Sequence, residues 1–418
     1  MFPFTYRNSH LHCDRVPLAE IARAVGTPVW VYSRARIEAN FRADAAAFAL
    51  LKAHIHYSLK ANANLAILRL LAGLGAGADV VSAGEVYRAL CAGFPAERIV
   101  FAGVGKTRAE LEYALQVGVG WFNVESEQEL ALLNALAGEV KPPVRVALRL
   151  NPDVQAETHR HMATGHAYAK FGIPLDAATR LTRDWGRFPA LRLEGAHVHI
   201  GSQLASPQPT ATAVRRALDF IDAARAAGHA ITALNVGGGI PIAYDEAQPP
   251  ATPQDFADAL APLLQGRNLT LLLEPGRRIV ADAGALLVEV QYVKVQGDAR
   301  FVVTDGGMND LLRPALYGAR HRVWPVTRAG EPSTPAQVAG PVCESSDFLA
   351  RDAALPPLAP GDLLAVLDAG AYGASMSSTY NARPLAPEVL VEGETFRVVR
   401  RRQTWEEMAA LEEELNRE

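Results

Sequence analysis

Short apolar runs alternate with amphipathic stretches through the first two thirds of the chain. Each run is rich in β-branched or aliphatic residues. A turn follows it, and then a stretch whose apolar residues recur three and four positions apart, as in "SEQELALLNALAG". Strands that alternate with helices predict a parallel sheet, and eight such units over roughly 220 residues predict a closed (β/α)8 barrel of the TIM type. The predicted strands are 54–60, 78–82, 98–103, 121–126, 144–151, 194–202, 233–239 and 269–277.

The pattern changes after Gly284. Apolar and polar residues then alternate with period two, and turns rich in Pro, Gly and Asp separate the runs without long helices between them. This pattern predicts an antiparallel β domain, of sandwich or barrel-like form. The early run "TPVWVYS" precedes the barrel and is expected to join that domain. We therefore predict a barrel over residues 34–280 and a second domain formed by 1–33 and 281–418.

Composition excludes several classes of partner. The chain has 418 residues, enough for two or three domains, and its net charge of −4 argues against binding a phosphate backbone. We interpret the basic run "VVRRRQ" as a solvated strand edge. No apolar segment reaches the ~18 residues of a membrane span, and no secretory signal opens the chain. Neither nucleic acid nor a membrane is expected as a partner.

The cysteines indicate the compartment. Cys13, Cys91 and Cys343 are an odd number and do not form a disulfide framework, which is typical of proteins in a reducing environment. The sequence therefore favours a cytoplasmic protein.

Polar residues end four of the predicted strands. Lys60 ends the first strand, His199 and Ser202 end the sixth, residues 237–239 end the seventh, and 274–277 end the eighth. In a (β/α)8 barrel the active site lies at the carboxyl ends of the strands, and these four strands are neighbours once the barrel closes. The polar groups are therefore expected to share one rim.

The run "GGG" is a candidate phosphate site. Its backbone N–H groups, including those of Gly238 and Gly239, can approach an anion without obstruction by side chains, and loops after strands seven and eight often bind phosphate in this fold. Ser202 and the N–H groups of Gly276 and Arg277 are expected nearby. The alternative is a plain turn after a strand.

A lysine that faces a phosphate site is typical of pyridoxal phosphate enzymes, in which it forms a Schiff base with the cofactor aldehyde. Glu274 would pair with the pyridine nitrogen and favour a protonated, electron-withdrawing ring, as a decarboxylation needs. His197 and His199 share a face of their strand, and we assign ring stacking to His199, which is nearer the rim. Asp79 is either a second acid near Lys60 or an N-cap for the next helix.

Three further histidines suggest a metal site at first sight. His159, His161 and His166 lie within residues 151–174, but their spacing is irregular and no acidic residues converge on them. No metal is expected.

With these motifs in view, the chain resembles the fold-type III pyridoxal phosphate decarboxylases, and among them the diaminopimelate decarboxylases. The resemblance rests on "YSLKAN", "GADVVSAGE", "HVHIGSQ", "NVGGG", "EPGR", "GMNDLLRPALYGARH", "GPVCESSDFL" and "DAGAYGASMSSTYNARPLAPEVLV". It covers nearly the whole chain. It implies catalytic roles for Lys60, His199 and Cys343. It implies cofactor contacts from Lys60, Asp79, His199, Ser202, Gly238, Gly239, Glu274, Gly276, Arg277 and Tyr372, and substrate contacts from Arg277, Arg313, Tyr317, Glu344 and Tyr372.

The resemblance also implies a reaction and an assembly. The expected reaction converts meso-2,6-diaminopimelate to L-lysine and carbon dioxide, the last step of lysine biosynthesis by the diaminopimelate route. The expected assembly is a homodimer in which Cys343 and Glu344 come from the partner subunit. Two alternatives stay open: a decarboxylase of a D-diamino acid such as D-ornithine or D-lysine, and a pyridoxal phosphate-binding protein without catalytic turnover.

Overall fold

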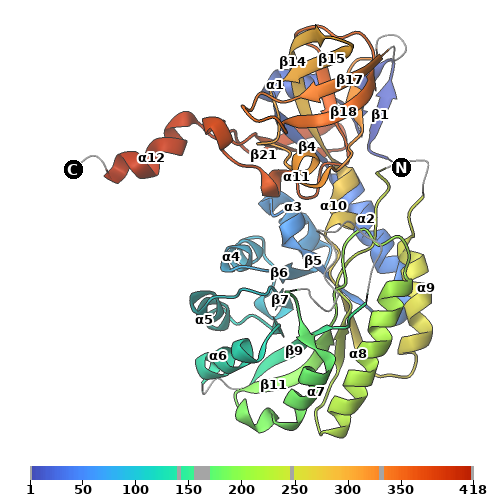
Figure 1. Ribbon diagram of the computed structural model, residues 1–418, viewed down its shortest axis with the longest axis vertical. Coiled ribbons are helices and arrows are strands. Elements are labelled where there is room, and N and C mark those ends of the chain that lie inside the picture. Colours follow the sequence, from blue (N-terminus) through green and yellow to red (C-terminus); the bar gives the residue numbers. More distant parts are fainter. Residues whose placement is uncertain (1, 139–142, 155–169, 245–248, 329–333, 416–418) are drawn as a thin grey trace. The chain divides into compact units, whose positions relative to one another are not determined.

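The computed structural model describes residues 2–138, 143–154, 170–244, 249–328 and 334–415 (Figure 1). Its contacts divide the chain into two compact units. We call Asn40–Arg278 the barrel unit. We call Met1–Ala39 together with Ile279–Glu418 the β unit.

The barrel unit contains a closed ring of eight parallel strands, which confirms the predicted fold. Neighbours follow the order β5-β6-β7-β8-β9-β11-β12-β13, and pairing of β13 with β5 closes the ring. The two-residue strand β10 pairs with β9 outside it. The strands are β5 (His54–Ser58), β6 (Gly77–Val80), β7 (Ile99–Phe101), β8 (Trp121–Val124), β9 (Val144–Asn151), β10 (Ile173–Pro174), β11 (Leu191–His197), β12 (Ala233–Asn235) and β13 (Thr270–Leu273).

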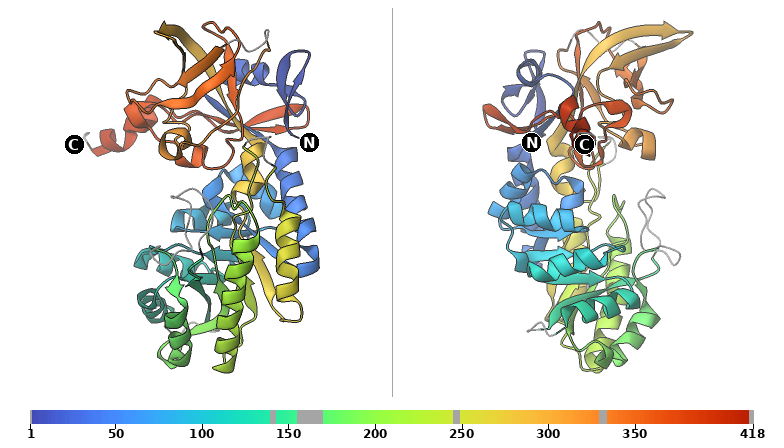
Figure 2. Two further views of the ribbon diagram at one scale, coloured as in Figure 1. Left: turned by 45° about the vertical axis from the view of Figure 1, so that its right-hand side comes forward. Right: turned by 90° about the vertical axis from the view of Figure 1, so that its left-hand side faces the viewer.

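Helices surround this ring (Figure 1). Several begin at a Ser or Thr whose side-chain oxygen accepts the backbone N–H three residues later: Ser82, Thr107, Ser126 and Thr252. These caps fix where each helix starts after its strand. α8 and α9 lie side by side, as the left view of Figure 2 shows. The helices are α3 (Leu65–Gly73), α4 (Ala83–Cys91), α5 (Arg108–Gln116), α6 (Glu127–Ala137), α7 (Leu175–Arg183), α8 (Gln208–Ala226) and α9 (Pro253–Leu264), with the 3₁₀ turns η1 (Ala49–Leu51), η2 (Leu59–Ala61), η3 (Ala96–Arg98) and η4 (Trp185–Arg187).

Glycines make room for large side chains inside the barrel. A Cβ at Gly77 would lie 2.6 Å from His56 Nε2, and one at Gly195 would lie 2.6 Å from the Trp121 ring. Glycine thus leaves space for a large side chain from the neighbouring strand at Gly77, and for one from β8, beyond β9, at Gly195.

The β unit is built on a sheet in the order β18-β17-β15-β14-β4-β20-β21. The predicted return of the early segment is confirmed, because β4 pairs with β14 and β20. Most pairings in this unit are antiparallel, as predicted, but β20–β4 and β15–β17 are parallel. The members of each parallel pair are far apart in sequence, so no tight hairpin imposes an antiparallel pairing. The strands are β1 (Phe4–Arg7), β2 (His10–Cys13), β3 (Val16–Pro17), β4 (Val29–Ser33), β14 (Gly284–Gln296), β15 (Ala299–Thr304), β16 (Val323–Pro325), β17 (Thr334–Ala339), β18 (Phe348–Leu355), β19 (Leu363–Val366), β20 (Glu388–Glu392) and β21 (Thr395–Arg400).

Short helices accompany this sheet. α2 runs across the first boundary between the units and α10 across the second, so each unit ends within a helix. The helices are α1 (Leu18–Val25), α2 (Arg34–Ala47), α10 (Arg277–Val280), α11 (Arg313–Tyr317) and α12 (Trp405–Leu415), with the turns η5 (Ala281–Ala283), η6 (Ala374–Met376) and η7 (Tyr380–Ala382).

Candidate active site

Lys60 lies just beyond the carboxyl end of β5. The strand ends at Ser58, two residues earlier than predicted, and Lys60 belongs to the turn η2. Its Nζ lies 3.4 Å from Asp79 Oδ2, and 39% of its side chain is exposed. The amine is therefore held beside an acid while remaining open on one side.

Asp79 is a buried acid within β6, and the helix that follows is capped by Ser82 instead. Burial and the nearby Glu274 carboxylate raise the pKa of Asp79 above its usual range, although Lys60 opposes this. Ser58 Oγ lies 2.5 Å from Asp79 Oδ2, and Asp79 Oδ1 is buried with no hydrogen-bond partner among the residues that the structure describes. Of the two interpretations of Asp79, the structure supports the acid near Lys60.

Glu274 follows β13 and is buried at the centre of the rim. Its Oε1 accepts hydrogen bonds from Asn123 Nδ2 at 3.3 Å and Asn235 Nδ2 at 2.5 Å. Its Oε2 lies 3.3 Å from His197 Nε2. Burial opposes ionisation, but attraction to His197 and Lys60 outweighs it and lowers the pKa of Glu274. Glu274 is therefore a carboxylate at neutral pH.

His199 lies two residues beyond β11, against the glycine loop. Its Nδ1 accepts a hydrogen bond from Gly238 N at 3.2 Å. A Cβ at Gly237 would lie 2.5 Å from the same nitrogen, so glycine is needed for this close contact. Burial, followed by repulsion from Lys60 and Arg149, lowers the pKa of His199 well below its ordinary value. The imidazole is neutral and carries its proton on Nε2.

The glycine loop continues past His199. A Cβ at Gly238 would lie 2.5 Å from the Glu274 carbonyl oxygen, and one at Gly239 would lie 2.8 Å from Leu204. A Cβ at Gly276 would lie 3.0 Å from the Cβ of Ser58 on the neighbouring strand. At these glycines the loops after β12 and β13 thus present backbone without a side chain.

Arg277 opens α10 and is buried. It donates from Nε to Ser202 Oγ at 3.2 Å and from Nη1 to Tyr244 OH at 2.9 Å. The structure therefore brings Ser202 and Arg277 together, as predicted, beside the glycine loop.

This rim fits pyridoxal phosphate. A carboxylate that stays ionised suits a pyridinium nitrogen, a flat neutral imidazole suits the ring, and side-chain-free loops beside Ser202 and Arg277 suit a phosphate. The open Lys60 amine suits the cofactor aldehyde.

The β unit carries the other predicted residues. Arg313 opens α11 and is buried, and its Nη1 lies 2.9 Å from His321 Nε2. His321 Nδ1 lies 2.9 Å from the Leu367 carbonyl oxygen. That carbonyl only accepts, so Nδ1 carries the proton and Nε2 accepts from Arg313. Tyr317, partly buried, ends the same helix.

Cys343 and Glu344 lie in an exposed loop between β17 and β18. Buried Asp347 fixes this loop by accepting N–H hydrogen bonds from Val342 at 2.7 Å and Met308 at 2.6 Å. Cys343 N also donates to Asn381 Oδ1 at 2.8 Å. A free thiol and a carboxylate are thus presented on a braced loop.

Tyr372 lies in "DAGAYG" with φ +57°, a left-handed conformation that non-glycine residues rarely adopt. Asp368, in the same segment, has φ +57° and pairs with Arg322 at 2.8 Å. The backbone of this segment therefore adopts a left-handed conformation at two non-glycine residues, Asp368 and Tyr372.

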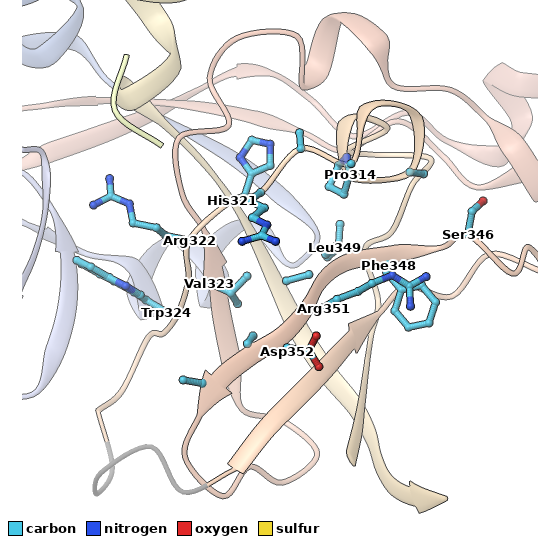
Figure 3. Close-up of a pocket in the computed structure, with 17 residues that line it drawn as sticks. Pro314, His321, Arg322, Val323, Trp324, Ser346, Phe348, Leu349, Arg351 and Asp352 are labelled. Atoms are coloured by element: carbon cyan, nitrogen blue, oxygen red, sulfur yellow. The ribbon is translucent and has the colours of Figure 1, made fainter. Parts of the chain in front are cut away.

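A cavity of about 820 Å³ in the β unit is distinct from these residues (Figure 3). It is lined by the end of α11, by β16 and by β18, and the sticks of His321, Arg322, Phe348 and Arg351 mark its wall. None of the predicted cofactor or substrate residues lines it. We assign it no role in the site.

Sequence reasoning missed several polar residues of the rim and its support. For the residues within strands the sequence did contain a signal. Residues two positions apart on a strand face the same side of the sheet, so a polar residue two positions from a core residue faces the barrel interior. Asn123 follows Trp121 at this spacing, and Asn235 follows Ala233. The missed residues are Ser58, Asn123, Asn235, Tyr244 and His321.

No cluster of metal-ligating side chains occurs among the residues that the structure describes. His159, His161 and His166 fall outside them. Within the same described ranges, no helix is long and apolar enough to cross a membrane.

Comparison with known proteins gives consistent matches. Residues 34–281 match the family model described as "Pyridoxal-dependent decarboxylase, pyridoxal binding domain". The chain is 46% identical over 416 residues to the diaminopimelate decarboxylase of Pseudomonas aeruginosa, covering 99% of both proteins. The corresponding enzyme of Aquifex aeolicus is 43% identical, over 96% of this chain and 95% of its own.

Solved structures agree over nearly the full length. The diaminopimelate decarboxylase of Helicobacter pylori, complexed with L-lysine, has a TM-score of 0.91 and 41% identity, covering 95% of this chain and 99% of its own. That of M. jannaschii, in co-complex with L-lysine, has a TM-score of 0.93 and 36% identity, covering 98% of this chain and 97% of its own.

Proposed function

Because the chain belongs to the pyridoxal-dependent decarboxylases, we propose that it converts meso-2,6-diaminopimelate to L-lysine and carbon dioxide. The reaction removes the carboxylate from the D-configured carbon and puts a proton in its place. It uses pyridoxal 5'-phosphate and is the last step of lysine biosynthesis by the diaminopimelate route. The observation that carries the reaction type is the buried, ionised Glu274.

The barrel residues would hold the cofactor. The Lys60 amine would join the cofactor covalently, with Asp79 as its neighbouring acid, and the His199 ring would cover one face. Glu274 would hold a proton on the pyridine nitrogen. The phosphate would be held by Ser202, Gly238, Gly239, Gly276 and Arg277, together with Tyr372 of the β unit. Bound in this way, the cofactor supplies an electron-withdrawing ring that takes up the electron pair left by departing carbon dioxide.

The residues of the β unit would recognise the end of the substrate that does not react. That end carries a carboxylate and an ammonium group, which need cationic donors and an acid together. Arg313 and Tyr317 would bind the carboxylate together with Arg277 of the barrel unit, with Tyr372 beside them, and Glu344 would bind the ammonium. His321 prepares Arg313 for this task because it already orders the guanidinium.

Cys343 would return a proton from Sγ to the carbon that lost carbon dioxide. An acid placed for this step contributes on the order of 10²–10⁴-fold to the rate. We propose that Cys343 and Glu344 reach the site from the partner subunit of a homodimer, so that residues 34–280 bind cofactor while 1–33 and 281–418 complete the site. The free cysteines support a cytoplasmic location.

The test of substrate choice is a comparison of kcat/KM for meso-diaminopimelate and D-lysine with purified holoenzyme. D-lysine lacks the distal carboxylate, so it cannot form the two to three charge-assisted hydrogen bonds that this carboxylate would accept. The kcat/KM for meso-diaminopimelate should therefore be higher by about 10²-fold or more. A preference for D-lysine would identify a decarboxylase of simple D-diamino acids. If the protein releases no carbon dioxide from either substrate, it would be a cofactor-binding protein without catalytic turnover.

A further inference from the structure

We propose that Asn123, Asn235 and Trp121 are positioning residues that fix the Glu274 carboxylate through side-chain amides oriented by N–H donors behind them. None of the three is assigned a contact with the cofactor or the substrate. The inference rests on the proposed function, in which Glu274 pairs with the pyridine nitrogen.

The first amide is oriented by an indole. Trp121 Nε1 donates to Asn123 Oδ1 at 3.2 Å, and Asn123 Nδ2 donates to Glu274 Oε1 at 3.3 Å. An indole nitrogen is a donor and never an acceptor, so the amide oxygen must face it. The amide NH₂ is thereby turned toward the carboxylate.

The second amide is oriented by the backbone. Gly237 N donates to Asn235 Oδ1 at 2.9 Å, and Asn235 Nδ2 donates to Glu274 Oε1 at 2.5 Å. Rotating either amide by half a turn would set its oxygen against the carboxylate and its NH₂ against an N–H donor. The orientation of both amides is therefore determined by their partners.

Both amides are buried deeply, with Asn123 0% and Asn235 1% exposed. Each donates to the same carboxylate oxygen, so Oε1 is saturated and Oε2 faces His197. An amide does not titrate, whereas the other groups around Glu274 do. The titratable groups that act on Glu274 from the packed elements are His56, Lys60, Asp79, His197 and His199. The amides supply a stabilising contact that stays constant with pH.

The decisive variant is Asn123→Asp, which has the same shape. Its carboxylate can still accept the Trp121 indole proton, but it replaces a donor to Glu274 with a second acid. Two adjacent buried carboxylates share a proton, so we expect a new ionisation between about pH 6 and 9. It should appear as a change with pH in the absorbance of the cofactor bound to the variant holoenzyme, beyond any change that the wild type shows over the same range.

The matched control is Asn134→Asp on α6. Asn134 Oδ1 accepts the Ala190 N–H at 3.0 Å, a contact that aspartate retains, so its spectrum should follow the wild type. A cofactor spectrum of Asn123→Asp with the same pH dependence as that of the wild type would overturn the inference.

A second variant covers the case in which Asn123→Asp does not fold. Trp121→Phe keeps the aromatic ring but frees the Asn123 amide to turn, so the dissociation constant of pyridoxal phosphate should rise about three- to tenfold. An unchanged dissociation constant and spectrum would contradict the positioning role. These readouts require no turnover, so a wild type without activity on meso-diaminopimelate would refute the proposed function and leave this inference standing.

Discussion

The acid beside Lys60 is suited to exchanging protons with it. Burial and Glu274 raise the pKa of Asp79, while Glu274 itself remains ionised under the influence of its cationic neighbours. Two carboxyl groups in one rim thus differ in their readiness to hold a proton, which is how enzymes divide acid and base roles. In the proposed reaction Asp79 serves the lysine and Glu274 serves the ring nitrogen.

Arg313 tests substrate recognition at the scale of one residue. Arg313→Gln removes the charged fork, so kcat/KM for meso-diaminopimelate should fall by roughly 10–100-fold, the effect of about 1.5–3 kcal/mol from a charge-assisted hydrogen bond. The value for D-lysine should change little, because D-lysine has no distal carboxylate. Steady-state kinetics on both substrates measures the difference.

The matched control is Arg320→Gln, an exposed arginine a few residues later in the same motif. It should leave both values near those of the wild type. Equal losses on both substrates in Arg313→Gln would instead assign the residue to the general stability of the β unit.

At the scale of elements, two aspartates hold the loops of the β unit. Asp347 accepts hydrogen bonds from the loop of Cys343, and Asp310 Oδ2 accepts Gly307 N at 3.2 Å ahead of α11. Gly307 leaves no room for a side chain, since a Cβ there would lie 2.6 Å from the Asp347 carboxylate. The two segments that carry candidate substrate-binding residues, the loop of Cys343 and the segment ahead of α11, therefore both pack against Asp347.

Asp310 should make stability depend on pH. Burial raises its pKa to about 7, against about 3.9 in an unfolded chain. Between these values the folded chain keeps a proton that the unfolded chain has released, so the free energy of unfolding falls as pH rises from about 4 to about 7. Asp310→Asn stays neutral, and its urea midpoint should fall less between pH 5 and pH 7 than that of the wild type.

Asp298→Asn, in the exposed turn between β14 and β15, is the control and should keep the dependence of the wild type. If Asp310→Asn loses stability across this range as steeply as the wild type does, Asp310 is ionised in the folded protein.

Sequence patterns predicted the barrel and its rim because two signals are local: the spacing of apolar residues along each strand, and the polar residues at its carboxyl end. Lys60, Glu274 and the glycine loop could be found in this way, since each follows directly on a predicted strand. The parallel pairing of β4 with β20 joins segments more than 350 residues apart, and local alternation contains no information about it. The same holds for the Arg313–His321 contact, whose geometry depends on packing against Leu367.

At the scale of the whole molecule, the proposed dimer predicts complementation between two inactive variants. Lys60→Ala and Cys343→Ala each damage one half of the site. If the halves come from different subunits, random mixing should restore about a quarter of wild-type activity, because half of the dimers would contain one intact site of two. Refolding the variants together and measuring carbon dioxide release tests this.

A control mixture of Lys60→Ala with Arg277→Ala should not recover, since both residues belong to the barrel unit of one chain. Recovery in neither mixture, with mixed dimers demonstrated by mass, would mean that Cys343 serves its own subunit or none.

The most direct test of the account measures carbon dioxide and L-lysine released from meso-diaminopimelate by the holoenzyme and by Lys60→Ala. The wild type should release the two products in equal amounts. Lys60→Ala should be slower by at least about a thousandfold, because the amine that would hold the cofactor is gone. Absence of L-lysine with the wild type, or comparable rates for the two proteins, would contradict the account.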